Sequence, residues 1–133
     1  MTQEEVTLAI RFIAAGAMVP TLKRSPFAST PCLLTPGLAD MPEGTQWRCR
    51  DGLRYEVAIA QGDLMLLPLL SDPSWWGWTL AEVERRGYRY SFKVWGEGKT
   101  FYESAVWKGN GAVNSVRFNS RSEHLVYMLE ATK

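Results

Sequence analysis

The fold class is decided by residues 88–107, which read YRYSFKVWGEGKTFYESAVW. Apolar and polar side chains alternate on both sides of Glu97-Gly98, and this period of two is typical of strands with one buried face. A glycine-containing pair between two such runs predicts a tight hairpin. The segment therefore predicts an antiparallel sheet.

The hairpin is expected to continue as a meander. Asn110-Gly111 is a second tight-turn signal, and it leads into a strand over 112–118. A turn over 119–123 then leads into an apolar run over 124–131, which we expect to be another strand. The last third of the chain thus predicts a four-stranded antiparallel meander.

A short helix over 79–87 is expected before the meander. Thr79 and Glu82 have the spacing of a capping box, and Gly87 suits the C-terminal end of a helix.

Three further strands are expected upstream of that helix. Asp51-Gly52 separates two strand-like runs and predicts a second hairpin. An apolar strand follows over 64–70. Pro68 places this strand at a sheet edge or at a bulge, because proline cannot donate a ladder hydrogen bond.

The N-terminal third divides into a helix and a proline-rich arm. Residues 3–15 predict a helix, with Thr2 and Glu5 as its capping box and Gly16 at its exit. Five of the seven prolines fall in residues 19–44, which excludes a regular helix or a central strand there.

The expected fold is therefore α+β in a single domain over 1–133. An N-terminal helix lies within 1–18 and the arm covers 19–44. Residues 45–133 form a bent, mostly antiparallel sheet of six or seven strands, open or partly closed, with the short helix inserted.

Composition excludes several classes of protein. Fifteen Lys and Arg against fourteen Asp and Glu give a net charge of +1, which excludes a strongly basic nucleic-acid coat and an acidic DNA mimic. Two cysteines exclude a disulfide scaffold and disfavour structural zinc, although a single Cys32–Cys49 disulfide stays open. The acidic start and the lack of a long apolar window predict a cytoplasmic protein without a membrane span.

Glu103 is the first candidate catalytic residue. Two-residue turns at both glycine pairs would place it on an aromatic face, between Phe92 and Phe118. A buried carboxylate must be protonated or paired, and perturbed carboxylates are candidates for acid–base catalysis. A structural role at the rim of the sheet, or an outward position at a bulge, is the favoured alternative.

His124 is the only histidine, and we expect it on the outer side of the last strand. A surface or structural role is favoured over catalysis, because no partner is identifiable. A dyad of His124 with Cys49 has no local signature. Neither a phosphate-binding loop nor a metal-ligand cluster is found, so no cofactor or metal is predicted.

Two groups of residues are candidate binding surfaces. The three tryptophans Trp75, Trp76 and Trp78 could cover one end of the sheet as a plug, or they could contact a protein partner. Contact with a protein partner is also possible for Leu8 and Phe12 on the first helix. A basic and aromatic face could instead bind nucleic acid. Its members are Arg85, Arg86, Arg89, Lys93, Trp95, Tyr102 and Arg117.

The leading functional hypothesis is a small non-enzymatic protein-binding module. Such a module could be an inhibitor, an immunity-type factor or a phage or plasmid accessory factor, and a homodimer is left open. The first alternative is a single-stranded nucleic-acid-binding protein that uses the basic and aromatic face. The second is a small enzyme that uses Glu103.

Overall fold

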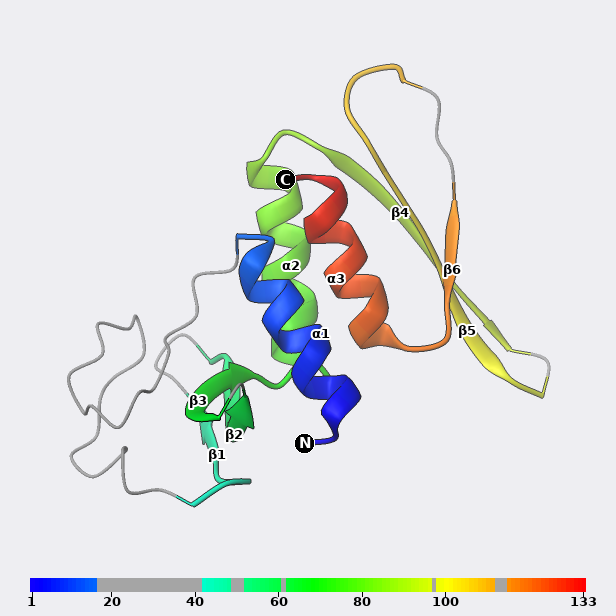
Figure 1. Cartoon of the computed structure of the whole chain (residues 1–133). Coiled ribbons are helices and arrows are strands. Elements are labelled where there is room, and N and C mark those ends of the chain that lie inside the picture. Colours follow the sequence, from blue (N-terminus) through cyan, green and yellow to red (C-terminus); the bar gives the residue numbers. More distant parts are fainter. Residues whose placement is uncertain (17–41, 49–51, 61, 97, 112–114) are drawn as a thin grey trace.

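The computed structural model describes residues 1–16, 42–48, 52–60, 62–96, 98–111 and 115–133, except for the side chains of Trp47 and Asp63. These residues form three helices and two three-stranded antiparallel sheets (Figure 1). The elements are α1 (Gln3–Ala14), β1 (Gln46–Arg48), β2 (Arg54–Ala60), β3 (Asp63–Pro68), α2 (Pro73–Arg85), β4 (Arg89–Gly96), β5 (Thr100–Trp107), β6 (Val116–Phe118) and α3 (Arg121–Ala131).

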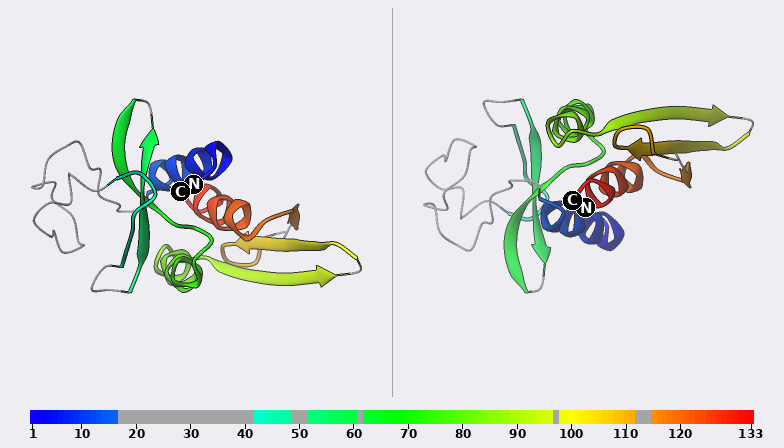
Figure 2. Two further views of the ribbon diagram at one scale, coloured as in Figure 1. Left: turned by 90° about the horizontal axis from the view of Figure 1, so that it is seen from below. Right: turned by 90° about the horizontal axis from the view of Figure 1, so that it is seen from above.

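The α+β class is confirmed, but the single sheet of six or seven strands is wrong. Strands β1-β2-β3 form one sheet and β4-β5-β6 form another, and neither is a closed barrel. The three helices pack together between the two sheets, and the β4–β5 hairpin projects beyond them (Figures 1 and 2). Most of the predicted arm, residues 19–41, lies outside the described residues, as do Cys32 and Cys49.

Helix α1 begins as its sequence predicts. The Thr2 hydroxyl accepts a hydrogen bond from the Glu5 amide at 3.1 Å, and the Glu5 carboxylate accepts one from the Thr2 amide at 3.3 Å. The reciprocal pair satisfies two amides that have no partner within the helix. Phe12, further along the helix, is fully buried.

Helix α2 begins six residues before the predicted position. Asp72 is its N-cap and accepts a hydrogen bond from the Ser74 amide at 3.1 Å, while Pro73 occupies the first turn. Thr79 lies inside the helix, where its hydroxyl donates to the Trp75 carbonyl at 2.7 Å. The predicted capping box of Thr79 and Glu82 is therefore wrong.

Helix α3 replaces the predicted last strand. The Ser120 hydroxyl accepts a hydrogen bond from the Glu123 amide at 3.2 Å and begins the helix. Four apolar residues of α3 are fully buried: Leu125, Val126, Met128 and Leu129. Residues three and four positions apart lie on the same side of a helix, so these four side chains form one broad apolar face. This face packs against α1, α2 and the second sheet.

The first sheet has β2 as its central strand. Four successive residues of β2, Tyr55–Ala58, are buried, so both faces of the strand are covered. Strand β3 is an edge strand, and Pro68 lies opposite Tyr55 at its end. The edge position predicted from this proline is confirmed.

The register of the second sheet differs from the prediction by one residue. Gly96 pairs with Thr100, so three residues separate the strands instead of two, and Gly98 has a φ of 77°. As a result Phe92 lies opposite Ser104 and not opposite Glu103. Side chains alternate between faces, so this shift moves Glu103 to the other face of the sheet.

The face of the second sheet that carries Phe92 is only partly covered. Val94 and Val116 lie on this face and are 55% and 36% exposed. The two large buried clusters of the described residues come instead from the helices and the first sheet.

Candidate nucleic-acid interface

The two faces of the second sheet have different surroundings. Phe92 and Phe118 meet α3, with ring centroids 5.0 and 6.2 Å from that of His124. Side chains that alternate with them lie on the opposite face, which points away from the helices. We call this opposite face the basic aromatic face, and it includes Arg89, Lys93, Trp95, Phe101, Glu103 and Arg117.

Two rings lie on the basic aromatic face near the turn that joins β4 to β5. Trp95 and Phe101 are cross-strand partners, with centroids 6.2 Å apart and planes 18° from parallel. Trp95 is 43% exposed, although a Trp of this size is more often buried. Lys93 Nζ lies 5.8 Å from the Trp95 ring, and the Arg117 guanidinium carbon lies 5.2 Å from the Phe101 ring. Each ring thus has a cation beside it.

Among the described residues, Glu103 is the one acid of this face. It lies between Lys93 and Arg117 in the register, and its Oε2 accepts a hydrogen bond from Trp95 Nε1 at 2.8 Å. The side chain is partly exposed. The predicted burial among aromatic rings is wrong, and the argument for Glu103 as a catalytic acid loses its basis.

Charge is unevenly distributed along the chain. Residues 88–121, which include the second sheet, contain six Lys and Arg and only two Glu. The rest of the chain contains nine Lys and Arg and twelve Asp and Glu. The net charge of +1 therefore conceals a basic segment, and electrostatic attraction to a polyanion would act on that segment.

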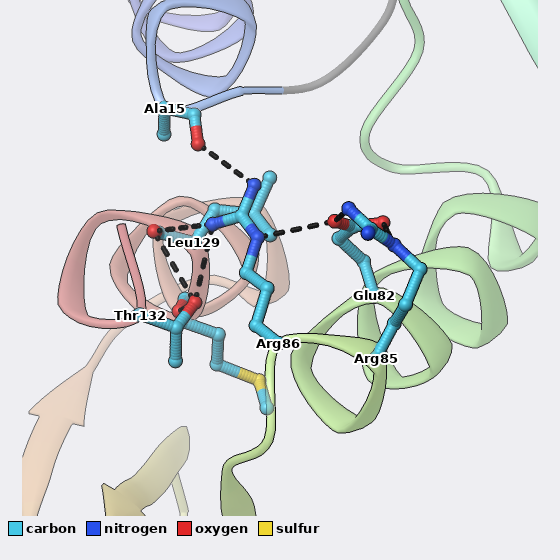
Figure 3. A network of polar contacts seen from close by, with 7 residues as sticks. Ala15, Glu82, Arg85, Arg86, Leu129 and Thr132 are labelled. Carbon is cyan, nitrogen blue, oxygen red and sulfur yellow. Dashed lines mark hydrogen bonds and ion pairs between the residues drawn. The ribbon is translucent and has the colours of Figure 1, made fainter.

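The remaining predicted nucleic-acid contacts lie elsewhere. Tyr102 is on the inner face, stacked 6.2 Å from Phe92. Arg86 is held between three helices, where it donates to Ala15, Leu129, Thr132 and Glu82 (Figure 3). Arg85 is exposed and forms an ion pair with the same Glu82 carboxylate. Both arginines hold the pKa of Glu82 below its ordinary value, with Arg85 having the larger effect and burial opposing them.

The predicted protein-binding residues belong mostly to the core. Leu8, Phe12 and Trp75 are buried in the same cluster, and Trp78 packs on Phe12 with centroids 5.7 Å apart. Trp76 is half-buried against His124 and Phe92. The interpretation of the tryptophans as a plug fits this geometry, and the buried Phe12 and Trp75 side chains are not open to a partner.

His124 lies inside the protein, not on its outer side as expected. It occupies the first turn of α3 with no exposed surface. Burial penalises the charged imidazolium and, together with the smaller effect of the nearby Arg121 cation, lowers the pKa of His124 to about 4. No group of His, Cys, Asp and Glu suited to a metal ion occurs within the described part of the chain.

No family model, curated protein or solved structure matches this chain. Within the described ranges, no helix combines the length and the apolar character required to cross a bilayer. The site itself must therefore carry the functional argument.

Proposed function

We propose that the chain binds single-stranded nucleic acid through the basic aromatic face. The observation that carries this proposal is the stacked pair of the exposed Trp95 and the half-buried Phe101, with Lys93 and Arg117 beside it. Proteins that bind single strands combine a basic surface, which follows the phosphates, with aromatic rings on which bases stack.

A single strand fits this face better than a duplex. The rings of Trp95 and Phe101 need unpaired bases, because bases in a helix are already stacked on one another. Arg89 lies on the same face of β4, six positions before Trp95, or about 20 Å along the strand at ~3.3 Å per residue. Cations and rings thus extend along a line and can follow an extended polyanion.

The test is binding of a fluorescent 15-nucleotide single strand, measured by anisotropy at low and moderate salt. Replacing Trp95 by Ala should weaken binding about tenfold, since one base–aromatic contact contributes ~1–3 kcal/mol. Val94→Ala is the matched control, because Val94 is the adjacent residue, is more exposed and lies on the other face. Lys93→Gln should lower the slope of log affinity against log salt by about 0.7.

Two outcomes would contradict the proposal. One is the absence of binding at low salt. The other is an equal affinity of the Trp95→Ala and Val94→Ala variants.

A protein partner is the second candidate, and one groove favours it. Between α1 and α3 lies a space of about 380 Å³ with apolar walls and an acidic rim. Its lining residues are Glu4, Thr7, Leu8, Arg11, Phe118, Glu123, Tyr127 and Glu130. The one cation there, Arg11, is paired with Glu130 at 2.5 Å, so the excess charge is negative and suits a basic amphipathic helix.

The probe for this second candidate is a synthetic helix of lysine and leucine. Glu123→Lys should weaken its binding, whereas Glu43→Lys, on an exposed residue outside the groove, should leave it unchanged. Equal effects of the two changes would exclude the groove as the binding site.

A further inference from the structure

The second sheet is joined to the body through a contact that is separate from the main core. Among the described residues, both large buried clusters consist of side chains from the three helices, the first sheet and the adjoining loops, with none from β4–β6. The inner face of the second sheet instead meets α2 and α3 around His124. Segments with few contacts to the core open more readily than the core itself.

His124 occupies the middle of that contact. Its ring lies 5.1 Å from Trp76 of α2, 5.0 Å from Phe92 of β4 and 6.2 Å from Phe118, where β6 ends. Neither ring nitrogen has a hydrogen-bond partner among the described residues, and the buried Ser104 hydroxyl has none either. Ser104 pairs with Phe92, so it lies on the same face of the sheet.

We propose that His124 is a pH switch that controls the docking of β4–β6 onto the helices. The neutral imidazole packs as an aromatic ring and holds the sheet in place, and protonation releases it. This inference does not depend on nucleic-acid binding, because it concerns the docking equilibrium and not the ligand.

The physical reason is the cost of a buried cation with two unpaired donors. Protonated imidazole carries an N–H at both nitrogens, and among the described residues of the docked site neither N–H has an acceptor. The faces of Trp76 and Phe92 would attract a cation, but weakly compared with the hydration that is lost. The protonated form is therefore favoured only when the ring reaches water.

The charged surroundings act in the same direction. Arg121 lies one turn before His124, its guanidinium carbon lies 5.6 Å from the Trp76 ring, and its positive charge opposes a second cation. α2, β4 and β6 present rings that do not titrate. The other titratable groups near the ring are Glu123 and Tyr127 on α3 and Tyr102, which stacks on Phe92. No carboxylate among the described residues bonds to the imidazole.

The direction and pH range follow from linkage. An imidazole in water has an ordinary pKa of 6.5, and burial lowers the pKa of docked His124 to about 4. Well above pH 6.5 both states are neutral and docking is at its strongest. Between 6.5 and 4 the released state binds a proton that the docked state does not, so docking weakens about tenfold per pH unit. From pH 7.5 to 5.5 the released fraction should rise about tenfold.

The experiment is NMR spectroscopy of the full chain between pH 7.5 and 5. His124 is the only histidine, so its Cε1 proton gives a single assignable titration. We expect amide protection factors in β4 and β5 to fall about tenfold between pH 7.5 and 5.5, while those of β2 and β3 hold. The proposal would be overturned if docked His124 had a pKa near 6.5. It would also be overturned if both sheets lost amide protection equally.

Two variants separate the switch from general acid sensitivity. His124→Phe keeps an aromatic ring and cannot titrate, so it should abolish the pH dependence of protection in β4 and β5. An unchanged pH dependence in this variant would also overturn the proposal. Should His124→Phe fail to fold, Arg121→Gln serves instead, with the titration extended below pH 5. It should raise the pKa of docked His124 and end the weakening of docking at a higher pH, and an unaltered pKa would overturn the proposed site.

Discussion

Arg86 Nη2 donates a hydrogen bond to the carbonyl oxygen of Ala15, 3.0 Å away and 71 positions earlier in the chain. Its Nη1 donates to the Leu129 carbonyl at 3.1 Å, and its Nε donates to Glu82 Oε1 at the same distance (Figure 3). The last carbonyls of a helix have no amide partner further along it, although the Leu129 carbonyl also accepts from the Thr132 amide at 3.3 Å. One guanidinium therefore binds the C-terminal ends of two helices and is itself held by a third.

Replacing Arg86 by Ala should lower the free energy of unfolding by about 1–3 kcal/mol, because the carbonyl of the buried Ala15 loses the donor that Arg86 supplies and the three helices lose their shared contact. Urea denaturation measures the change. Arg85→Ala is the matched control, since Arg85 binds the same Glu82 from an exposed position and should have little effect. Equal losses in the two variants would contradict the bridging role of Arg86.

Gly16→Ala should destabilise the protein for two separable reasons. Gly16 has a φ of 108°, which disfavours any side chain, and an added Cβ would lie 2.6 Å from Arg86 Nη2. We expect a loss of about 1–3 kcal/mol. Gly44→Ala, with a φ of 92° and open space, carries only the first reason and should cost less. In an Arg86→Ala background the two glycine variants should lose similar amounts of stability, because the side chain near Gly16 is gone. Thermal unfolding would measure both losses.

Trp75→Phe should lower stability by about 2–3 kcal/mol, because the indole Nε1 donates to the Arg54 carbonyl at 2.6 Å and the ring is 1% exposed. Trp95→Phe, on an exposed ring, should leave the urea midpoint unchanged. If instead Trp75→Phe is neutral for folding, the interpretation of Trp75 as a core residue is wrong.

Glu103→Gln should tighten binding of a single-stranded oligonucleotide several-fold at low salt. The amide oxygen can still accept from Trp95 Nε1, while the negative charge beside the phosphates is removed. The gain should shrink as salt is added, and stability should not change. Glu43→Gln, away from this face, is the control for total charge. A large loss of stability in Glu103→Gln would show that the carboxylate is structurally required.

Local sequence determined those features whose causes lie within a few residues. The helix start at Thr2 and Glu5 needs only a hydroxyl and a carboxylate three positions apart. The edge position of Pro68 follows from its missing amide proton, and antiparallel hairpins follow from the alternation around Glu97-Gly98.

Two helix starts were also readable from the sequence but were missed. Asp72-Pro73 is a capping residue followed by a proline in the first turn, and Ser120 precedes Glu123 at capping-box spacing. The apolar residues within 124–131 also fit a strand, and this pattern was given more weight than the Ser120 cap. A short apolar run suits a buried helix as well as a strand, so periodicity alone could not decide between them.

Tertiary structure alone decided the register and the place of the titratable groups. A loop of two or three residues is compatible with Gly98, and the choice moves Glu103 between opposite faces of the sheet. Packing of Phe92 and Phe118 against α3 selects one register over the other. His124 follows the same logic, because its burial depends on rings from α2, β4 and β6. These lie up to 48 positions away in the chain, and no local pattern brings them together.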